Sequence, residues 1–336
     1  MEASALKARL TTPIRERSAR ARAADPTFKA ILTGLAALIL VIIVFFFVFL
    51  ADKAWPAFEQ FGVIGFIFDN DWNVSQSIYG ALPLVVGTVI TSVLALLIGV
   101  PVAVATALFV TEMCPRRLRS PLTVLIELLA AVPSVVYGLW GIFVLVPAVR
   151  AFQLALPDAL RQLPIFSGPP LGVGMLSATL ILAVMVVPFT SSVAREVLKS
   201  VPLAQREAAY ALGATRFEAI SAALYYARTG IVGATMLGFG RALGETMAVT
   251  MVIGNNPQVS ASLFAPQYTM AAVIANEFTE AADELYLHAL IEIGLVLFII
   301  TLIVNGLSRL LIWSMSRSAA RARVPAPEPS VAAVQA

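Results

Sequence analysis

One arginine and one glutamate lie inside a long apolar run in the second half of the chain. Arg241 and Glu245 stand four residues apart, and the run from Gly230 to Ile253 contains no other charge. Residues four apart share a helix face, so Glu245 is expected to pair with Arg241. A guanidinium can also donate two parallel hydrogen bonds to an oxyanion. The pattern predicts either an ion pair that only fixes helix packing or an anion-binding arginine held in place by Glu245.

The position of Arg241 places its charge deep in a membrane. If the helix begins at Gly230, Arg241 lies about 16 Å along it at ~1.5 Å per residue, near the middle of a ~30 Å hydrocarbon core. A cation there costs at least ~2.5–3.5 kcal/mol on insertion scales, so it should face the bundle interior or a water-filled path. If an anion is transported past Arg241, its binding there must be weak enough for the anion to leave the site.

A polar, alanine-rich segment precedes this run and contains residues typical of the starts and ends of two helices. Residues 191–229 form the largest polar excursion between two apolar runs. Pro202 suits a first helical turn, and Gly213 can take the left-handed conformation that ends a helix. Thr215, followed three residues later by Glu218, has the spacing of a capping box. The sequence predicts a short helix, a turn and a second helix.

Small side chains in the first of these helices favour close approach by another surface. They are Ala204, Ala208, Ala209 and Ala211. Arg206 and Glu207 could fix the register of such a contact. An ordinary solvated amphipathic loop explains the same residues and remains open.

Composition decides the protein class. Apolar residues make up 59% of the 336 residues and charged residues 13%, against roughly 45–50% and 25% in soluble domains. The chain is therefore an integral membrane protein. Cys114 and His288 are the only cysteine and histidine, which excludes an intramolecular disulfide and a Cys/His zinc or haem cluster. We expect no metal, no cofactor and no catalytic residue.

The apolar runs predict six membrane spans, each close to the roughly 20 residues that cross a bilayer or bent to fit. The spans cover residues 30–50, 78–110, 122–146, 171–190, 230–253 and 288–313. Pro101 and Pro133 predict kinks in the second and third spans. Glu127 and Glu292 then become intramembrane carboxylates, for which structural pairing and pathway lining both stay open.

The distribution of basic residues predicts the orientation. With both termini cytoplasmic, Lys53, Arg150 and Arg161 are the only basic residues in outer loops, and Arg241 alone lies inside a span. All other lysines and arginines fall on the inner side, as the positive-inside rule requires. The basic amino-terminal arm is expected to be a cytoplasmic retention signal rather than a nucleic-acid-binding segment.

Gly240 and Gly244 form a small-residue face on the fifth span. Such faces allow close backbone contact between membrane helices. We expect the two glycines to serve helix packing, either within the chain or against a partner.

The polar segment resembles a known loop. Glu207, Ala208 and Ala209, with Gly213 following, are similar to the EAA loop of ABC-importer permeases, whose coupling helix contacts an ATPase subunit. The family pattern continues with Ile-x-Leu-Pro, and the aligned positions here are Ala223, Tyr225 and Tyr226. By this resemblance the ATPase-coupling residues are Arg206, Glu207, Ala208, Ala209 and Gly213.

Two longer stretches narrow the resemblance. Residues 238–249 resemble the same helix of phosphate-specific transport permeases, and residues 133–141 resemble the third span of their C subunit. The likeness covers residues 77–313. It implies the all-α fold of a type I ABC importer transmembrane domain, with six transmembrane helices and a cytoplasmic coupling-helix loop. The expected organisation is a basic cytoplasmic arm (1–28), a first helix with an external loop (29–76), the permease domain (77–313, coupling loop 191–229) and a disordered cytoplasmic tail (314–336).

The resemblance also implies a function and a set of partners. The chain would be a permease subunit of an ATP-driven phosphate importer in the bacterial inner membrane, with Arg241 and Glu245 on the phosphate path. Its partners would be a second homologous permease, two cytoplasmic ATP-binding subunits, an external phosphate-binding protein and membrane lipid, without nucleic acid. No Gly-x-x-x-x-Gly-Lys-Ser/Thr loop occurs here, so ATP hydrolysis is expected on other subunits.

Two alternatives remain at this stage. A permease for another oxyanion would carry the same features. A secondary anion transporter independent of ATP would explain the buried arginine and the carboxylates, but it would have no need for a docking helix with Glu207 and Gly213.

Overall fold

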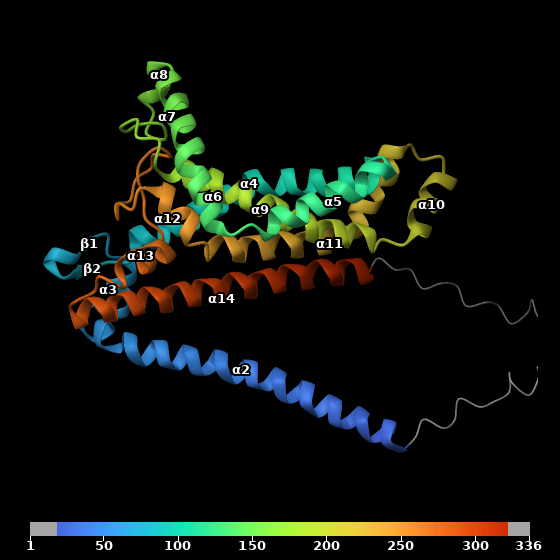
Figure 1. Ribbon diagram of the computed structural model, residues 1–336, viewed down its shortest axis with the longest axis horizontal. Coiled ribbons are helices and arrows are strands. Elements are labelled where there is room, and N and C mark those ends of the chain that lie inside the picture. The colour runs from blue at the N-terminus through green and yellow to red at the C-terminus, as the bar shows by residue number, and fades with distance from the viewer. Residues whose placement is uncertain (1–18, 322–336) are drawn as a thin grey trace, which may run out of the picture. The chain divides into compact units, whose positions relative to one another are not determined.

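The computed structural model describes residues 19–321, and it is almost entirely helical (Figure 1). Among the described residues, those up to Lys53 and those from Ala54 onward form two separate compact units. The predicted arm and tail lie largely outside the described residues, although the last helix continues to Arg321 and so covers the first residues of the predicted tail.

The first unit is one apolar helix. It belongs to α2, which runs over Ala19–Phe61 and continues into the second unit. The stretch Phe28–Phe61 is long and apolar enough to cross a membrane, which confirms the first predicted span. Large apolar side chains are exposed along it from Ile31 to Phe49, as expected of a helix that lipid surrounds.

The second unit contains all the other elements. In chain order they are α3 (Val63–Phe68), β1 (Trp72–Asn73), the 3₁₀-helix η1 (Val74–Gln76), β2 (Ile78–Tyr79), α4 (Leu82–Leu108), the π-helical turn η2 (Phe109–Met113), α5 (Arg116–Ala131), α6 (Ser134–Trp140), the π-helical turn η3 (Gly141–Leu145), α7 (Val146–Ala155), α8 (Asp158–Arg161), α9 (Met175–Lys199), α10 (Leu203–Ala211), α11 (Arg216–Leu243), α12 (Met247–Ile253), α13 (Met270–Glu277) and α14 (Glu284–Arg321).

Within the described residues, five helices can span a membrane by length and composition, or six if the bent pair α11 and α12 counts as one span. Four predicted spans correspond to α2, α4 with η2, α9 and α14. The predicted fifth span corresponds to the bent pair. The third span is displaced: it covers Ser134–Ala155, not residues 122–146. The helix of the fifth span begins at Arg216, not at Gly230, so the depth of about 16 Å expected for Arg241 does not follow from the start of this helix.

Pro133 explains the displacement, because it ends a helix where we expected it to kink one. Val132 has φ −61° and ψ 131°, the extended conformation that a following proline imposes. Helix α5 before this point is therefore separate, and arginines occupy its first turns at Arg116, Arg117 and Arg119. Glu127 lies on α5 with a side chain 53% exposed. The expectation that Glu127 lies in the third span was wrong.

The bundle is built on α9, which packs against α4, α5, α11 and α12 (Figure 1). Small residues bring these helices together. A Cβ added to Gly99 of α4 would lie 3.2 Å from the carbonyl oxygen of Ala183 in α9, and one added to Gly238 of α11 would lie 2.5 Å from Thr190 Oγ1. Figure 1 shows α10 at one end of this bundle and α7 with α8 at the other.

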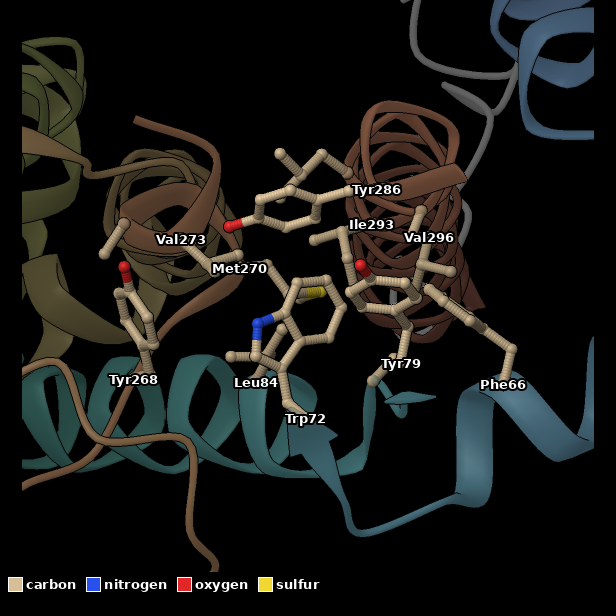
Figure 2. Close-up of a cluster of buried hydrophobic side chains, with 14 residues drawn as sticks. Phe66, Trp72, Tyr79, Leu84, Tyr268, Met270, Val273, Tyr286, Ile293 and Val296 are labelled. Carbon is tan, nitrogen blue, oxygen red and sulfur yellow. The ribbon is translucent and has the colours of Figure 1, made fainter. Parts of the chain in front are cut away.

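An aromatic cluster closes the end of the unit opposite α10 (Figure 2). The short hairpin of β1 and β2 pairs Trp72 with Tyr79, and their ring centroids are 5.2 Å apart. The Tyr79 ring also stacks on Tyr286 of α14 at 5.5 Å. Glu277 accepts hydrogen bonds from Trp72 Nε1 (3.1 Å) and the Tyr286 hydroxyl (2.6 Å). Burial of Tyr79 raises the pKa of its hydroxyl.

Candidate functional site

The apolar run that contains Arg241 is two helices rather than one. Helix α11 ends at Leu243, α12 begins at Met247, and their axes differ by 62°. Arg241 occupies the last turn of α11, and Glu245 lies in the break. The two residues therefore do not share a continuous helix face, and the expected Arg241–Glu245 ion pair is absent from the described structure.

Glu245 instead stabilises the start of α12. Its Oε1 accepts a hydrogen bond from the backbone N–H of Ala248 at 3.2 Å. A carboxylate is favourable at this position because the first N–H groups of a helix have no partner within it and carry partial positive charge. Thr246 accepts a hydrogen bond from Thr250 Oγ1 through its carbonyl oxygen at 2.8 Å. The Glu245 carboxylate and the Thr246 carbonyl oxygen thus both accept hydrogen bonds at the break.

The guanidinium of Arg241 is left without a counterion. Arg241 makes no ion pair with any described residue, and its buried Nε has no hydrogen-bond partner there. Its Cζ lies 5.6 Å from the ring centroid of Phe189 on α9. An aromatic face at this distance gives a cation only modest stabilisation. Arg241 is half-buried, so the arrangement presents a cation that an entering anion can neutralise.

Tight packing positions α12 beside α6. A Cβ on Gly138 of α6 would lie 2.5 Å from Met251 Sδ and 3.2 Å from Ala248 Cα. A Cβ on Gly141 would lie 2.9 Å from Val252 Cγ1. A side chain at either position would force its neighbours to shift, which accounts for the Tyr-Gly-Leu-Trp-Gly spacing in the stretch that begins at Pro133. The third span therefore holds the second half of the bent helix.

Gly240 and Gly244 do not provide the closest helix contacts of α11 within the described residues. A Cβ on Gly240 would meet Asn305 Oδ1 only at 3.8 Å, and one on Gly244 would meet only the carbonyl oxygen of Gly240 at 3.7 Å. The close helix contacts of α11 are at Gly230, against Val197, and at Gly238. Packing of the Gly240 and Gly244 face against a partner stays a prediction.

The predicted short helix, turn and second helix are confirmed: they are α10, the turn at Gly213 and the start of α11. Helix α10 follows Pro202, and Gly213 has φ +83°, the left-handed conformation that glycine adopts freely. Thr215 and Glu218 form the capping box: Thr215 Oγ1 accepts from the Glu218 N–H, and Glu218 Oε2 accepts from the Thr215 N–H at 2.7 Å. Local chemistry alone thus fixes the turn between α10 and α11.

Arg206 and Glu207 of α10 have opposite surroundings. Arg206 Nη2 donates to Glu112 Oε1 at 2.7 Å and to the carbonyl oxygen of Leu198 at 3.1 Å. Arg216 Nη2 donates to the Glu112 carbonyl oxygen at 2.6 Å. Glu207 is exposed. Arg206 therefore anchors α10 to η2 and α9, while Glu207 is available to a partner.

Glu112 is a functional residue that our sequence reasoning missed. It lies 94 positions from Arg206, so no local spacing joins them. The available signal was an acidic residue directly after an apolar run and before the basic Arg116 and Arg117. A carboxylate in such a place needs a cationic partner, but the sequence offers several.

Exposed apolar side chains lie close to Glu207 in the sequence, on α10 and at the start of α11. Leu203 is 70% exposed, Tyr210 51%, Leu212 89% and Phe217 79%. Ala208 is also exposed and Ala209 half-buried. Exposed apolar groups with small residues between them mark a protein interaction surface. Helix α10 and the start of α11 are therefore the candidate docking surface of the described chain.

Two further carboxylates differ in their surroundings. Glu127 accepts from Arg195 Nη2 at 2.6 Å, which makes it a structural partner. Glu292 of α14 is fully buried, and neither carboxylate oxygen has a hydrogen-bond partner in the described structure. Among the described residues, no group of three or more His, Cys, Asp or Glu side chains could hold a metal ion.

Comparison with known proteins identifies relatives over most of the chain. Residues 99–317 match the family model described as binding-protein-dependent transport system inner membrane component. The chain is 43% identical to the phosphate transport system permease protein PstC of Mesorhizobium japonicum, covering 85% of this chain and 89% of the relative. It is 47% identical to PstC of Pasteurella multocida, covering 80% and 85%.

Solved structures bear on the fold. An inward-facing chain of the MetNI methionine ABC transporter aligns with a TM-score of 0.51 and 15% identity, covering 70% of this chain and 94% of that chain. A second crystal form of the same transporter aligns with a TM-score of 0.50. The predicted all-α fold of a type I ABC importer permease is confirmed.

Proposed function

This chain belongs to the family of binding-protein-dependent transport system inner membrane components, and on that premise we propose that it is a permease subunit of an ATP-driven phosphate importer. The observation that carries the proposal is its 43–47% identity to phosphate permeases over most of its length. The uncompensated Arg241 beside the helix break supplies a matching chemistry. The chain is a multi-pass protein of the inner membrane.

Arg241 is the proposed phosphate contact on the path. A guanidinium recognises a phosphate oxyanion by paired hydrogen bonds, which an ammonium cannot reproduce. Because no carboxylate neutralises Arg241 in the described structure, phosphate does not have to displace one. Glu245 contributes indirectly by holding the break that ends α11 just beyond Arg241.

The surface on α10 is the proposed docking site for an ATPase subunit. Glu207 and the exposed apolar patch supply the contact, and Arg206 transmits movement through Glu112 to the end of α4. The importer would contain a second homologous permease, two ATP-binding subunits and an external phosphate-binding protein. This chain would carry no catalytic residue, both of its termini would be cytoplasmic, and residues 191–229 would form the coupling loop.

Uptake of radiolabelled phosphate into proteoliposomes tests the proposal. The importer is reconstituted with its partner subunits, and native protein is compared with Arg241→Lys and with Glu207→Arg. We expect ATP-dependent uptake that falls at least tenfold in each variant, since one loses the paired hydrogen bonds and the other the docking charge. The exposed Arg150, changed to Lys, is the matched control and should keep native uptake.

The outcomes separate the alternatives. Uptake that ignores ATP and Glu207 would identify a secondary carrier. Sulfate uptake as fast as phosphate uptake would identify a permease for another oxyanion. Native uptake by Arg241→Lys would remove Arg241 from the mechanism while leaving the family membership intact.

A further inference from the structure

A basic cavity lies between η2, α5, α9 and α10. Its volume is about 600 Å³. Five cationic side chains line it together with Glu112, and they are Arg116, Arg119, Arg195, Lys199 and Arg206. Arg216, which contacts Glu112, is about 37 Å from Arg241 along α11 at 1.5 Å per residue. The cavity is therefore separate from the proposed phosphate contact in the membrane.

The cations of the cavity outnumber the carboxylates that pair with them. Glu112 pairs with Arg206, and Glu127 and Glu196 share Arg195. Lys199 also uses Glu196. The three carboxylates thus pair with three of the five cations, and two cations are left without a carboxylate partner among the described residues. The excess positive charge lies on α5, where Arg116 has no ion pair with a described residue and Arg119 donates only to the Thr111 carbonyl oxygen at 2.7 Å.

Arg195 is a largely buried cation at the wall of the cavity. Its side chain is only 4% exposed, and only Nη2 has partners. Its Nε and Nη1 are buried and have no hydrogen-bond partner in the described structure. Leaving buried donors of a charged group unsatisfied is costly, and the negative charge of an anion in the adjacent cavity would offset part of that cost. Phosphate oxygens are strong acceptors for guanidinium groups.

The cavity also has the right size and a favourable backbone environment. A water molecule takes about 30 Å³ of liquid, so 600 Å³ admits a phosphate group with part of its hydration shell. Arg116 is the first residue of α5, whose positive helix end therefore lies at the cavity wall. Charge, donors and volume all point to one ligand class.

We propose that this cavity is a second phosphate-group site, distinct from Arg241, on the face of the permease that carries the coupling helix. Its ligand is free inorganic phosphate or the headgroup of an anionic phospholipid. Which side of the membrane it faces rests on the proposed function. Because Arg206 both lines the cavity and anchors α10, a bound anion competes with Glu112 for Arg206 and so links anion concentration to the position of α10.

Binding of radiolabelled phosphate to the assembled importer in phosphatidylcholine nanodiscs tests the site by equilibrium dialysis. The importer carries Arg241→Lys, so that phosphate bound at the proposed contact in the membrane contributes least to the measured binding. Arg116→Gln and Arg119→Gln are each compared with Arg117→Gln, which removes the same charge from the same helix but not from the cavity wall. We expect the dissociation constant to rise about tenfold in the first two and less than twofold in the control.

The lipid arm repeats the titration in nanodiscs that contain phosphatidylglycerol. An unchanged dissociation constant identifies free phosphate as the ligand. A rise that Arg116→Gln abolishes identifies the lipid headgroup. Equal binding by Arg116→Gln, Arg119→Gln and Arg117→Gln in both membranes would overturn the site.

The same preparations, with native Arg241, are assayed for ATP-driven uptake. Normal uptake together with binding that ignores Arg116 and Arg119 removes the cavity site alone. Absence of uptake in native protein removes the proposed function, whatever the cavity binds.

Discussion

Breaking the contact between Arg206 and Glu112 should release the coupling helix from the rest of the permease. The two side chains are 20% and 15% exposed, and their closest atoms are 2.7 Å apart. Arg206→Met keeps much of the apolar stem and removes the charge, while Glu112→Gln keeps the shape of the acceptor. Each change leaves one largely buried charged group without its partner.

The expected free-energy cost of either change lies between that of losing an exposed ion pair and that of breaking a buried one. Exposed pairs contribute about 0–1 kcal/mol, whereas removing one partner of a buried pair costs about 3–5 kcal/mol. We therefore expect about 2 kcal/mol for either variant, which corresponds to roughly a 30-fold change in the equilibrium between anchored and released α10. The double variant should cost much less than the sum of the two, because both changes remove the same contact.

Hydrogen exchange of the backbone amides of α10 measures this equilibrium directly, since exchange reports local opening. The amides of Leu203–Ala211 should exchange up to about 30-fold faster in each single variant, and phosphate transported per ATP hydrolysed should fall in parallel. Arg228→Met is the control, because Arg228 lies over the Tyr225 ring at 3.8 Å and makes no ion pair with a described residue of α10. Native exchange in Arg206→Met, or strictly additive costs in the double variant, would refute the anchoring role.

Two further predictions concern packing and capping. Gly87→Ala should lower the thermal stability of the purified chain by a free energy of about 1–3 kcal/mol or more, because its Cβ would overlap the backbone carbonyl of Tyr268, whereas Gly240→Ala should leave the stability unchanged or higher. Equal melting temperatures for the two variants would contradict the packing described for α4. Thr215→Ala should destabilise the first turn of α11 by about 1 kcal/mol, seen as faster amide exchange near Glu218, and Thr215→Ser should restore it. Native exchange in Thr215→Ala would show that the capping box contributes nothing.

Features fixed by local chemistry could be predicted from the sequence. The ends of α10 and the start of α11 follow from Pro202, Gly213 and the capping box, each of which acts over three or four residues. Most of the spans follow from length and apolarity in the same way. Pro133 was recognised, but a proline can kink a helix or end it, and only the structure shows that Val132 becomes extended and α5 ends here.

Contacts between distant segments could not be predicted. Glu112 and Arg206 are 94 residues apart, and Arg195 and Glu127 are 68 apart. Several basic residues stand near each acid in the sequence, so composition leaves the pairing open. The same holds for the tight glycines: Gly238 and Gly240 have equal local context, and only the place of α9 makes Gly238 the close contact.

The bend between α11 and α12 changes what the spacing of Arg241 and Glu245 means. In a continuous helix, four residues bring the two charges together, and an entering anion would have to compete with a carboxylate. Here the tight fit of α12 against Gly138 favours a separate short helix, whose unpaired N–H groups take up the Glu245 carboxylate. Arg241 is then left with the ring of Phe189 and no counterion among the described residues. A backbone break thus turns a pair of opposite charges into a helix cap and an arginine that has no counterion among the described residues.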